Sequence, residues 1–335
     1  MGRQMNFAIV GCGNIGQKRA KSLQSDDKLI FCADTNIGNA RKLAHKYGSE
    51  SLWYYIDALT PDVDAVIISP NNSNLFPVAM CAIENKKHVL IEKPAGINTE
   101  EISRMIEFSK KQNVIVMVGY NHRKHSALLK ANRIINDGEI GGVNYIVAKY
   151  GHGGCANENA NSWRLNKSLS GGGELIEKSC HLIDLSRWIF KMKDDELFKK
   201  INGIIKNYHR DKLEDNTFLN LETNLGQIAF LHGSCTDWRN TFEFSIYGGM
   251  GKIDITGLGG SYGIEKLSFS QIKKNEIKPL VFQQEFLNED NSWSEELKEF
   301  KKCIELNGLP QSNLYSALET MRVVEEIYKM NGVNI

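Results

Sequence analysis

The segment Gly11-Cys-Gly-Asn-Ile-Gly16 carries three glycines in the spacing G-x-G-x-x-G, and its neighbours restrict what it can form. An apolar run, Asn6–Val10, precedes it, and a helix-like run, Ile15–Leu23, follows it. A glycine-rich turn between a buried strand and a helix is typical of a dinucleotide-binding unit. The first glycine permits the tight turn, the second lets a pyrophosphate approach the backbone, and the third permits close packing of helix and strand. Free N–H groups at the helix N-terminus favour phosphate binding there.

Asp34 ends the next apolar run and indicates which dinucleotide the turn favours. A carboxylate there accepts hydrogen bonds from ribose hydroxyls and repels a 2′-phosphate. Thr35 and Asn36 stand where an NADP-binding chain often has a basic residue. We therefore expect NAD rather than NADP, held by Asp34 and by the turn residues Gly11, Gly13, Asn14, Ile15 and Gly16. A glycine-rich turn without a ligand is the alternative, which the flanking strand and helix disfavour.

Short apolar runs alternate with helix-like runs up to residue 121. The apolar runs, which read as buried parallel strands, are Asn6–Val10, Leu29–Ala33, Ala65–Ser69, Val89–Ile91 and Val114–Val118. The helix-like runs are Ile15–Leu23, Asn39–Tyr47, Pro77–Glu84 and Thr99–Lys111. This alternation predicts an α/β domain with a doubly wound parallel sheet over residues 1–121.

The rhythm changes in residues 122–335, where strands follow one another without intervening helices. A helix is expected at Ala127–Asp137, and strands at Val143–Tyr150, Lys200–His209, Asn216–Thr223, Gln227–Cys235, Thr241–Tyr247 and Gly251–Thr256. Consecutive strands indicate a large, mostly antiparallel sheet in an α+β domain. Two further helices are expected at Glu285–Leu306 and Leu314–Met330, and the last is a candidate to pack back on the first domain.

Lys93 follows the apolar run His88–Ile91 in the sequence Glu92-Lys93-Pro94. Ligands of open α/β sheets bind outside the carboxyl ends of the strands, where a nicotinamide ring would lie. Pro94 restricts Lys93 to an extended conformation. A solvated surface charge is the alternative for a single lysine.

The stretch Gly171–Asp184, GGGELIEKSCHLID, places three glycines before a helical run that carries Glu177, His181 and Asp184. On a helix Glu177 and His181 share a face. Histidine titrates near neutrality and can take the proton of a reacting hydroxyl, and a neighbouring carboxylate can orient it. An amphipathic helix with a polar stripe is the alternative. Lys178 lies off this face and is expected in solvent.

Charge and cysteine usage narrow the possible partners. The chain has 41 Lys+Arg against 40 Asp+Glu, so its net charge of +1 favours neither nucleic acid nor a membrane surface as partner. The seven cysteines form no C-x-x-C pair and fit neither a disulfide framework nor a zinc spacing. We therefore expect a cytoplasmic protein that holds no metal, and no apolar run is long enough for a membrane span.

Several motifs together resemble the glucose-fructose oxidoreductase, inositol dehydrogenase and rhizopine-catabolism (Gfo/Idh/MocA) family. They are AIVGCGNIG, Asp34, ISPNNSN, IEKPAG, VGYNHR and SGGGELIEKSCHLIDLSRW, spread over nearly the whole chain. The resemblance implies a Rossmann domain followed by a domain whose open sheet often builds oligomer contacts. It also implies NAD(P)-dependent oxidation or reduction of sugars, cyclitols and sugar nucleotides, in a homo-oligomer such as a dimer or tetramer.

The resemblance assigns roles to individual residues. Lys93 matches the lysine that hydrogen-bonds the reacting oxygen, and His181 matches the catalytic histidine. Glu177 stands where many members carry Asp, and Asp184 is expected to support the helix. The further residues expected at the cofactor are Ser69, Pro70, Asn71, Asn74, Glu92 and Lys93, with Asn74 where many relatives place His. Those expected at the substrate are Lys93, Asn121, Arg123, Trp163, Arg164 and His181. His125 belongs to the same segment as Asn121 and Arg123, where the family lines its pocket. Either arginine could instead form a domain-interface salt bridge.

These expectations converge on an enzyme, an NAD(P)-dependent dehydrogenase or reductase that acts on CH–OH groups. Two alternatives stay open. Some relatives use tightly held NAD for transient oxidation during glycoside cleavage, with no net redox change. A Rossmann fold can also serve a non-catalytic nucleotide-sensing protein, since a fold does not fix a function.

Overall fold

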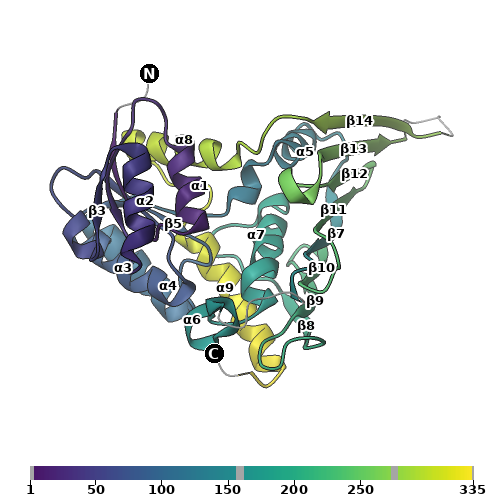
Figure 1. The fold of residues 1–335 in the computed structure, drawn as a ribbon. Coiled ribbons are helices and arrows are strands. Elements are labelled where there is room, and N and C mark those ends of the chain that lie inside the picture. The colour runs from purple at the N-terminus through teal and green to yellow at the C-terminus, as the bar shows by residue number, and fades with distance from the viewer. Residues whose placement is uncertain (1–3, 156–161, 273–277, 334–335) are drawn as a thin grey trace. The chain divides into compact units, whose positions relative to one another are not determined.

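The computed structural model describes residues 4–155, 162–272 and 278–333, which form two compact units (Figure 1). The first unit runs to Asn121 and also includes Ser168–Gly171 and Trp293–Leu318. The second contains His122–Lys167, Gly172–Ser292 and the chain from Glu319 onward. Within the described ranges, no helix combines the length and the apolar character that crossing a bilayer requires.

The first unit is built on a six-stranded parallel sheet with the order β3-β2-β1-β4-β5-β6. Its strands are β1 (Asn6–Val10), β2 (Lys28–Ala33), β3 (Glu50–Leu52), β4 (Ala65–Ile68), β5 (His88–Glu92) and β6 (Val116–Gly119). Its helices are α1 (Asn14–Ser22), α2 (Ile37–Tyr47), α3 (Asn72–Glu84), α4 (Thr99–Gln112) and most of α6 (Lys167–Ser170) and α8 (Ser292–Leu306). The strand order reverses at β1, which pairs with β2 on one side and β4 on the other. A ligand crevice is expected at the carboxyl ends of β1 and β4.

The strand β3 and the helix α3 of this unit differ from expectation. The strand β3 (Glu50–Leu52) was not predicted, because three residues are too few to show a period. The predicted helix start at Pro77 was wrong, because α3 begins at Asn72 and contains Pro77 in its interior. The doubly wound fold of the unit is confirmed.

A buried ion cluster joins α8 to the centre of the first unit. Arg19 is fully buried, and its Nε donates to Oε1 of Glu92 over 2.7 Å, while its Nη1 pairs with Glu296 on α8. Burial alone would lower the pKa of Arg19, but the two carboxylates raise it above its ordinary value. Leu297 and Phe300 complete the attachment of α8 by packing into the apolar core.

The second unit carries an eight-stranded sheet with the order β14-β13-β12-β11-β7-β10-β9-β8. Its strands are β7 (Val143–Gly151), β8 (Lys200–Lys206), β9 (Asn216–Glu222), β10 (Ile228–Ser234), β11 (Thr241–Gly248), β12 (Gly251–Thr256), β13 (Glu265–Gln271) and β14 (Leu280–Phe286). Every pairing among these strands is antiparallel except that of β7 with β10. The mostly antiparallel sheet is therefore confirmed. The predicted helix at Glu285–Leu306 was wrong at its start, since Glu285 belongs to β14 and α8 begins at Ser292.

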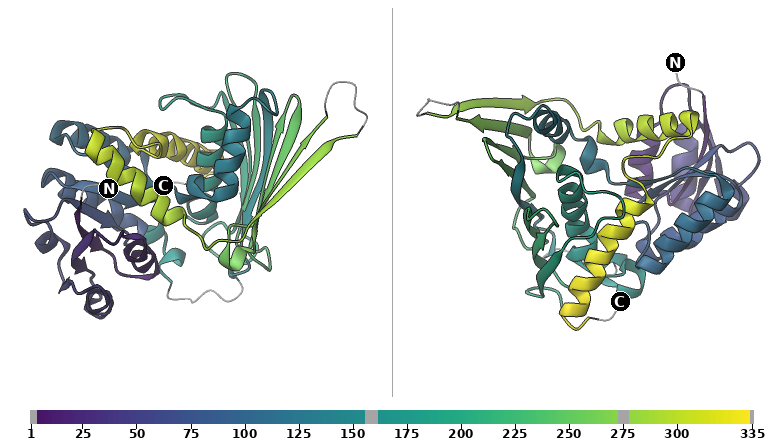
Figure 2. Two further views of the ribbon diagram at one scale, coloured as in Figure 1. Left: turned by 90° about the horizontal axis from the view of Figure 1, so that it is seen from above. Right: turned by 180° about the vertical axis from the view of Figure 1, so that it is seen from behind.

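One face of this sheet packs on helices, and the other is open (Figure 2). Along β7, β9 and β10 residues alternate between buried and exposed positions, as a half-covered sheet requires. The buried face contacts α5 (Ser126–Asn136) and α7 (Cys180–Ile189). The last helix, α9 (Leu314–Met330), has its first residues in the first unit and its remainder in the second.

Candidate active site

The three glycines of the first turn meet different surroundings. Gly11 has φ +88°, and a Cβ there would lie 2.5 Å from the backbone of Ser69 and Pro70. A Cβ on Gly16 would lie 2.1 Å from the carbonyl oxygen of Gly11. At Gly13, by contrast, a Cβ would meet no atom of the described residues within 4 Å. The backbone at Gly13 therefore offers the open space that a pyrophosphate needs, as the motif predicts.

Asp34 lies at the carboxyl end of β2 and is held in place by the backbone of the turn. Its Oδ2 accepts a hydrogen bond from the Cys12 amide over 2.7 Å, and its Oδ1 accepts one from the Asn36 amide over 2.7 Å. Each carboxylate oxygen can accept more than one hydrogen bond, so both can still bind ribose hydroxyls. The glycine turn and Asp34 together fit an adenine dinucleotide without a 2′-phosphate.

The turn after β4 borders the same crevice. The Ser69 hydroxyl donates to the Gly11 carbonyl oxygen over 2.8 Å, which joins the two turns at the switch point. Asn74 donates from Nδ2 to Oδ1 of Asn71 over 2.7 Å and so steadies the start of α3. Pro70, Asn14 and Ile15 lie on these turns or on the first turn of α1. The cofactor contacts of these residues stay predictions.

Lys93 directly follows β5 and is half-buried, at the strand end where the sequence placed it. Glu92 is engaged by Arg19, so its observed role is to bind that guanidinium. Asn121 is buried and ends the first unit.

The glycines before the His181 helix allow a close approach within the second unit. A Cβ on Gly172 would lie 1.9 Å from the Tyr328 hydroxyl, and one on Gly173 would lie 2.1 Å from the Glu214 carbonyl oxygen. Glu214 Oε1 accepts hydrogen bonds from the amides of Gly173 and Leu175 and from the Tyr328 hydroxyl, at 2.9, 3.0 and 2.7 Å. Burial raises the pKa of Glu214, and these hydrogen bonds oppose the rise. Gly172 and Gly173 thus form a close-approach turn before the helix.

The helix itself begins differently from the predicted one. A π-helical turn, Leu175–Ser179, precedes α7, so the spacing between Glu177 and His181 is not that of a continuous α-helix. Oε2 of Glu177 lies 3.7 Å from Nε of Arg164, whose guanidinium covers the Trp163 ring at 4.6 Å. The orientation of His181 by Glu177 stays a prediction.

His181 is buried and stacks on His122. The ring centroids lie 3.9 Å apart with an angle of 17° between planes, and Tyr150 contacts both rings edge-on. Sequence reasoning missed His122, although it lies between Asn121 and Arg123 in the segment that was singled out. The signal was its position directly after β6, where pocket residues were expected.

Arg123 and Asp184 form a buried pair within the second unit. Nε of Arg123 donates to Oδ2 of Asp184 over 2.8 Å, and Nη2 donates to Oδ1 over 2.5 Å. Burial raises the pKa of Asp184, which the arginine opposes. The supporting role expected of Asp184 is consistent with this pair, whereas substrate contact by Arg123 stays a prediction. His125 lies nearby, with Nδ1 3.6 Å from Oε2 of Glu265.

Lys178 is not solvated, and that expectation was wrong. Its Nζ lies 4.2 Å from the centroid of the Tyr150 ring and 3.1 Å from the Tyr262 hydroxyl. Burial alone would lower the pKa of Lys178, but Tyr150, Tyr262 and Glu174 raise it. Burial also raises the pKa of Tyr150 to about 12. Lys178 lies in the π-helical turn, so its position cannot be read from α-helical spacing.

Two family models match the chain. Residues 5–120 match the model described as "Oxidoreductase family, NAD-binding Rossmann fold", and residues 128–254 match the "GFO/IDH/MocA C-terminal domain". Both models describe one family. Along the chain the match to the Rossmann model precedes the match to the C-terminal model, as the parallel sheet precedes the mostly antiparallel sheet.

Among curated proteins, the chain is 32% identical over 201 residues to levoglucosan dehydrogenase of Pseudarthrobacter phenanthrenivorans, covering 56% of the chain and 51% of that protein. It is 26% identical to myo-inositol 2-dehydrogenase of Thermotoga maritima, covering 58% and 57%. The match to D-glucoside 3-dehydrogenase of Escherichia coli is 26% identical and covers 72% and 71%. The aligned part thus spans only about half of the first two relatives.

A solved structure titled levoglucosan dehydrogenase in complex with NADH superposes with a TM-score of 0.89 at 19% identity. The match covers 98% of this chain and 97% of that one. A structural match at 19% sequence identity shows that the two chains share a fold.

Proposed function

The chain belongs to the GFO/IDH/MocA oxidoreductase family, and we propose that it transfers a hydride between NAD and a secondary alcohol or ketone of a sugar-like substrate. The observation that carries the proposal is the dinucleotide cradle of Gly13 and Asp34. The open backbone at Gly13 and the fixed carboxylate of Asp34 both match what NAD requires. When bound, NAD supplies the acceptor or the source of the hydride.

The proposal names two candidate catalytic groups. His181, in the second unit, takes the hydroxyl proton when the alcohol is oxidised, because imidazole can accept a proton near neutral pH. Lys93, in the first unit, hydrogen-bonds the reacting oxygen and stabilises the negative charge that develops on it. Glu177 is the candidate to orient His181, because a neighbouring carboxylate can fix an imidazole and raise its basicity.

The substrate class rests on the relatives, whose names specify levoglucosan, myo-inositol and a D-glucoside. We therefore place the substrate among sugars, cyclitols and sugar nucleotides. The test is a screen of the purified chain with NAD and NADP against free sugars, cyclitols, sugar acids and sugar nucleotides, with NADH or NADPH formation as the readout. Turnover in one of these classes, faster with NAD, supports the proposal. Tight NAD binding without turnover in any class would favour a nucleotide-sensing role instead.

A second copy of the chain is the proposed partner of the open sheet face. This face exposes apolar side chains at Ile204, Phe218 and Phe230, which line a hollow together with polar groups such as Lys149 and Glu243. Contiguous exposed apolar surface of this kind marks interaction sites. Light scattering after gel filtration should give a dimer or tetramer for the wild type and smaller particles for Phe230→Glu. Leu225→Glu, at an exposed turn, is the matched control and should leave the mass unchanged.

A cytoplasmic location is likewise proposed, because the cysteines other than Cys155 and Cys235 are free thiols. The expectation that the cysteines form no disulfide was wrong for one pair, because the parallel strands β7 and β10 bring Cys155 and Cys235, 80 residues apart in the chain, to the same sheet edge, where they bond. Fractionation of cells that produce the tagged chain tests the location.

A further inference from the structure

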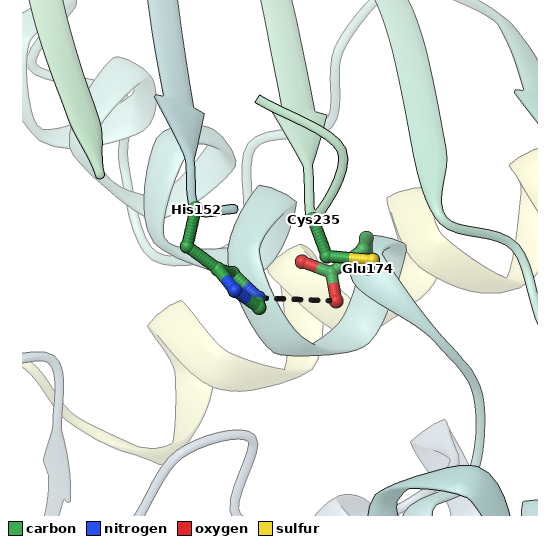
Figure 3. A group of neighbouring side chains, drawn as sticks. All are labelled: His152, Glu174 and Cys235. Atoms are coloured by element: carbon green, nitrogen blue, oxygen red, sulfur yellow. Dashed lines mark ion pairs between the residues drawn. The ribbon is translucent and has the colours of Figure 1, made fainter. Parts of the chain in front are cut away.

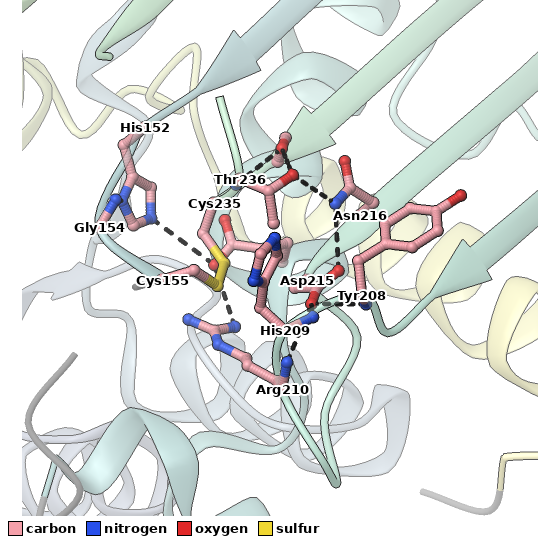
Figure 4. The surroundings of a disulfide bond; sticks show 12 residues. His152, Gly154, Cys155, Tyr208, His209, Arg210, Asp215, Asn216, Cys235 and Thr236 are labelled. Carbon is pink, nitrogen blue, oxygen red and sulfur yellow. Dashed lines mark hydrogen bonds and ion pairs between the residues drawn. A yellow bond between two sulfur atoms is a disulfide. The ribbon is translucent and has the colours of Figure 1, made fainter. Parts of the chain in front are cut away.

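Four side chains that can bind a metal gather where β7 and β10 end. His152 follows β7, Cys235 follows β10, and Glu174 directly precedes the π-helical turn (Figure 3). One ligand atom from each of these three residues lies within 4.8 Å of the other two. Cys155 joins the group through its bond to Cys235, with the two Cα atoms 5.3 Å apart (Figure 4). No function described above uses this cluster.

The backbone holds the group together independently of the sulfur–sulfur bond. The strands β7 and β10 are parallel neighbours, so their carboxyl ends lie at the same edge of the sheet. The His152 amide donates to the Ser234 carbonyl over 2.9 Å, and the Cys155 amide donates to the Cys235 carbonyl over 3.1 Å. The two sulfur atoms therefore stay close when the disulfide is reduced.

A second observation, on the carboxylate of Glu174, is independent of the distances between the four side chains. The residue is 1% exposed, and its Oε1 lies 3.1 Å from Nη1 of Arg210 and 3.7 Å from Nε2 of His152. Its other oxygen, Oε2, is buried and accepts no hydrogen bond from the residues that the structure describes. A buried carboxylate oxygen without a partner is costly, and a metal ion would remove that cost.

We propose that the reduced chain binds one zinc-class divalent cation through Cys155, Cys235, Glu174 and a ring nitrogen of His152. Two sulfurs, one nitrogen and one oxygen suit the tetrahedral coordination of Zn²⁺. Nδ1 of His152 accepts a hydrogen bond from the Gly154 amide over 3.0 Å. This hydrogen bond is lost when the ring becomes a ligand, because Nδ1 then either binds the metal or carries the ring proton while Nε2 binds it. Arg210 keeps its contact with Oε1 of Glu174, while the metal takes Oε2.

The chemistry balances in two steps. A small dithiol reduces the disulfide by two electrons and is itself oxidised to a disulfide, which leaves Cys155 and Cys235 as thiols. The cation then displaces one proton from each thiol, so two protons are released for each metal bound. Oxidation and metal binding are thus mutually exclusive states of the same pair of cysteines.

The test uses the full chain. The chain is reduced with a dithiol, the dithiol is removed under argon, and the reduced chain is titrated with Zn²⁺ in competition with a chromogenic chelator. We expect one Zn²⁺ for each reduced chain and none at this site in the oxidised chain. The Cys155→Ser/Cys235→Ser variant should lose the site, and Glu174→Gln should weaken it by more than about tenfold. The matched control Cys81→Ser/Cys303→Ser removes two cysteines that lie outside the cluster and should bind like the wild type.

A second measurement needs no variant. In the reduced wild-type chain, Zn²⁺ should slow the alkylation of Cys155 and Cys235 by iodoacetamide and leave Cys81 unprotected. Mass spectrometry of the peptides that contain these cysteines measures the alkylation. The proposal is overturned if the reduced chain binds no stoichiometric Zn²⁺, if Zn²⁺ leaves Cys155 and Cys235 unprotected, or if the folded double-serine variant binds as well as the wild type.

Discussion

The imidazole rings of His181 and His122 lie face to face, with centroids 3.9 Å apart and planes within 17° of parallel. His122 thereby fixes the ring that we assign to proton transfer. It is a positioning residue in this account, because it acts through His181.

Replacement of His122 tests this positioning role. His122→Phe keeps a flat ring under His181 and should lower kcat by less than about tenfold, whereas His122→Ala frees the ring and should cost on the order of 10–100-fold. KM should change little in either variant. Equal and large losses of kcat in both variants would instead make His122 a proton carrier.

His181 and Lys93 should each be required for turnover but not for cofactor binding. His181→Asn and Lys93→Met are expected to lower kcat by about 10²–10⁴-fold, the range for the loss of a group that transfers a proton or stabilises charge. The NAD dissociation constant, measured by calorimetry, should stay close to that of the wild type. Lys111→Met, on the exposed face of α4, serves as the control. Near-normal turnover in either variant contradicts the assignment.

Alanine at two glycines of the first turn should separate binding from folding. Gly13→Ala places a methyl group in open space and should weaken NAD binding while leaving the unfolding temperature nearly unchanged. Gly16→Ala places its Cβ 2.1 Å from the Gly11 carbonyl oxygen and should destabilise the fold by about 1–3 kcal/mol. Thermal unfolding and calorimetry check the pair. Unchanged NAD affinity in Gly13→Ala would show that the cofactor does not approach this backbone.

Asp34 should determine the choice between the two nicotinamide cofactors. Asp34→Ser removes the charge that repels a 2′-phosphate and the acceptor for the ribose hydroxyls. The ratio of kcat/KM for NAD to that for NADP should therefore fall by more than about tenfold, since hydrogen bonds to charged groups contribute about 1.5–3 kcal/mol. An unchanged ratio would place the discrimination elsewhere.

Asp215 should make stability depend on acid pH. Its Oδ2 accepts hydrogen bonds from the amides of Tyr208, His209 and Arg210, at 2.8, 2.6 and 3.0 Å. Burial alone would raise the pKa of Asp215, but these bonds, with one from the Asn216 side chain, hold it below its ordinary value. The ionised carboxylate therefore stabilises the fold above its unfolded-state pKa of about 3.9. This stability is lost as the pH falls through the lower pKa of the folded state.

Asp215→Asn makes that dependence measurable. At pH 7 the free energy of unfolding should fall by about 1.5–3 kcal/mol, because the variant loses charge-assisted hydrogen bonds. The difference from the wild type should shrink as the pH falls below about 4, because the unfolded wild-type chain takes up a proton there and the folded chain does so only at lower pH. Urea unfolding at a series of pH values checks both. A difference that stays constant down to the lowest pH would mean that the charge of Asp215 does not stabilise the fold.

The sequence predicted elements with a clear apolar pattern and missed elements whose pattern is weak. β1 and α9 have the predicted bounds, because β1 is a continuous apolar run and the apolar residues of α9 recur at helix spacing. β14 was missed because Gln283, Gln284 and Glu285 interrupt its apolar residues and leave only a short apolar run. Its last residues were therefore read as the start of a charged helix.

The candidate site was predictable only where a local motif fixes it. The roles of Gly11, Gly13 and Asp34 follow from residues close in the chain, and the structure gives each the expected surroundings. The stack of His122 on His181 and the burial of Lys178 depend on contacts between distant segments and on an inserted π-helical turn. No periodicity in the sequence reports such contacts.

Hydride transfer itself is most directly measured with a substrate deuterated at the carbon that bears the reacting hydroxyl, chosen from the class that the screen identifies. The account predicts one deuterium in the reduced NAD for each ketone formed, and loss of this transfer in His181→Asn. Product that forms while NAD is recovered without net reduction, as in glycoside cleavage, would contradict it.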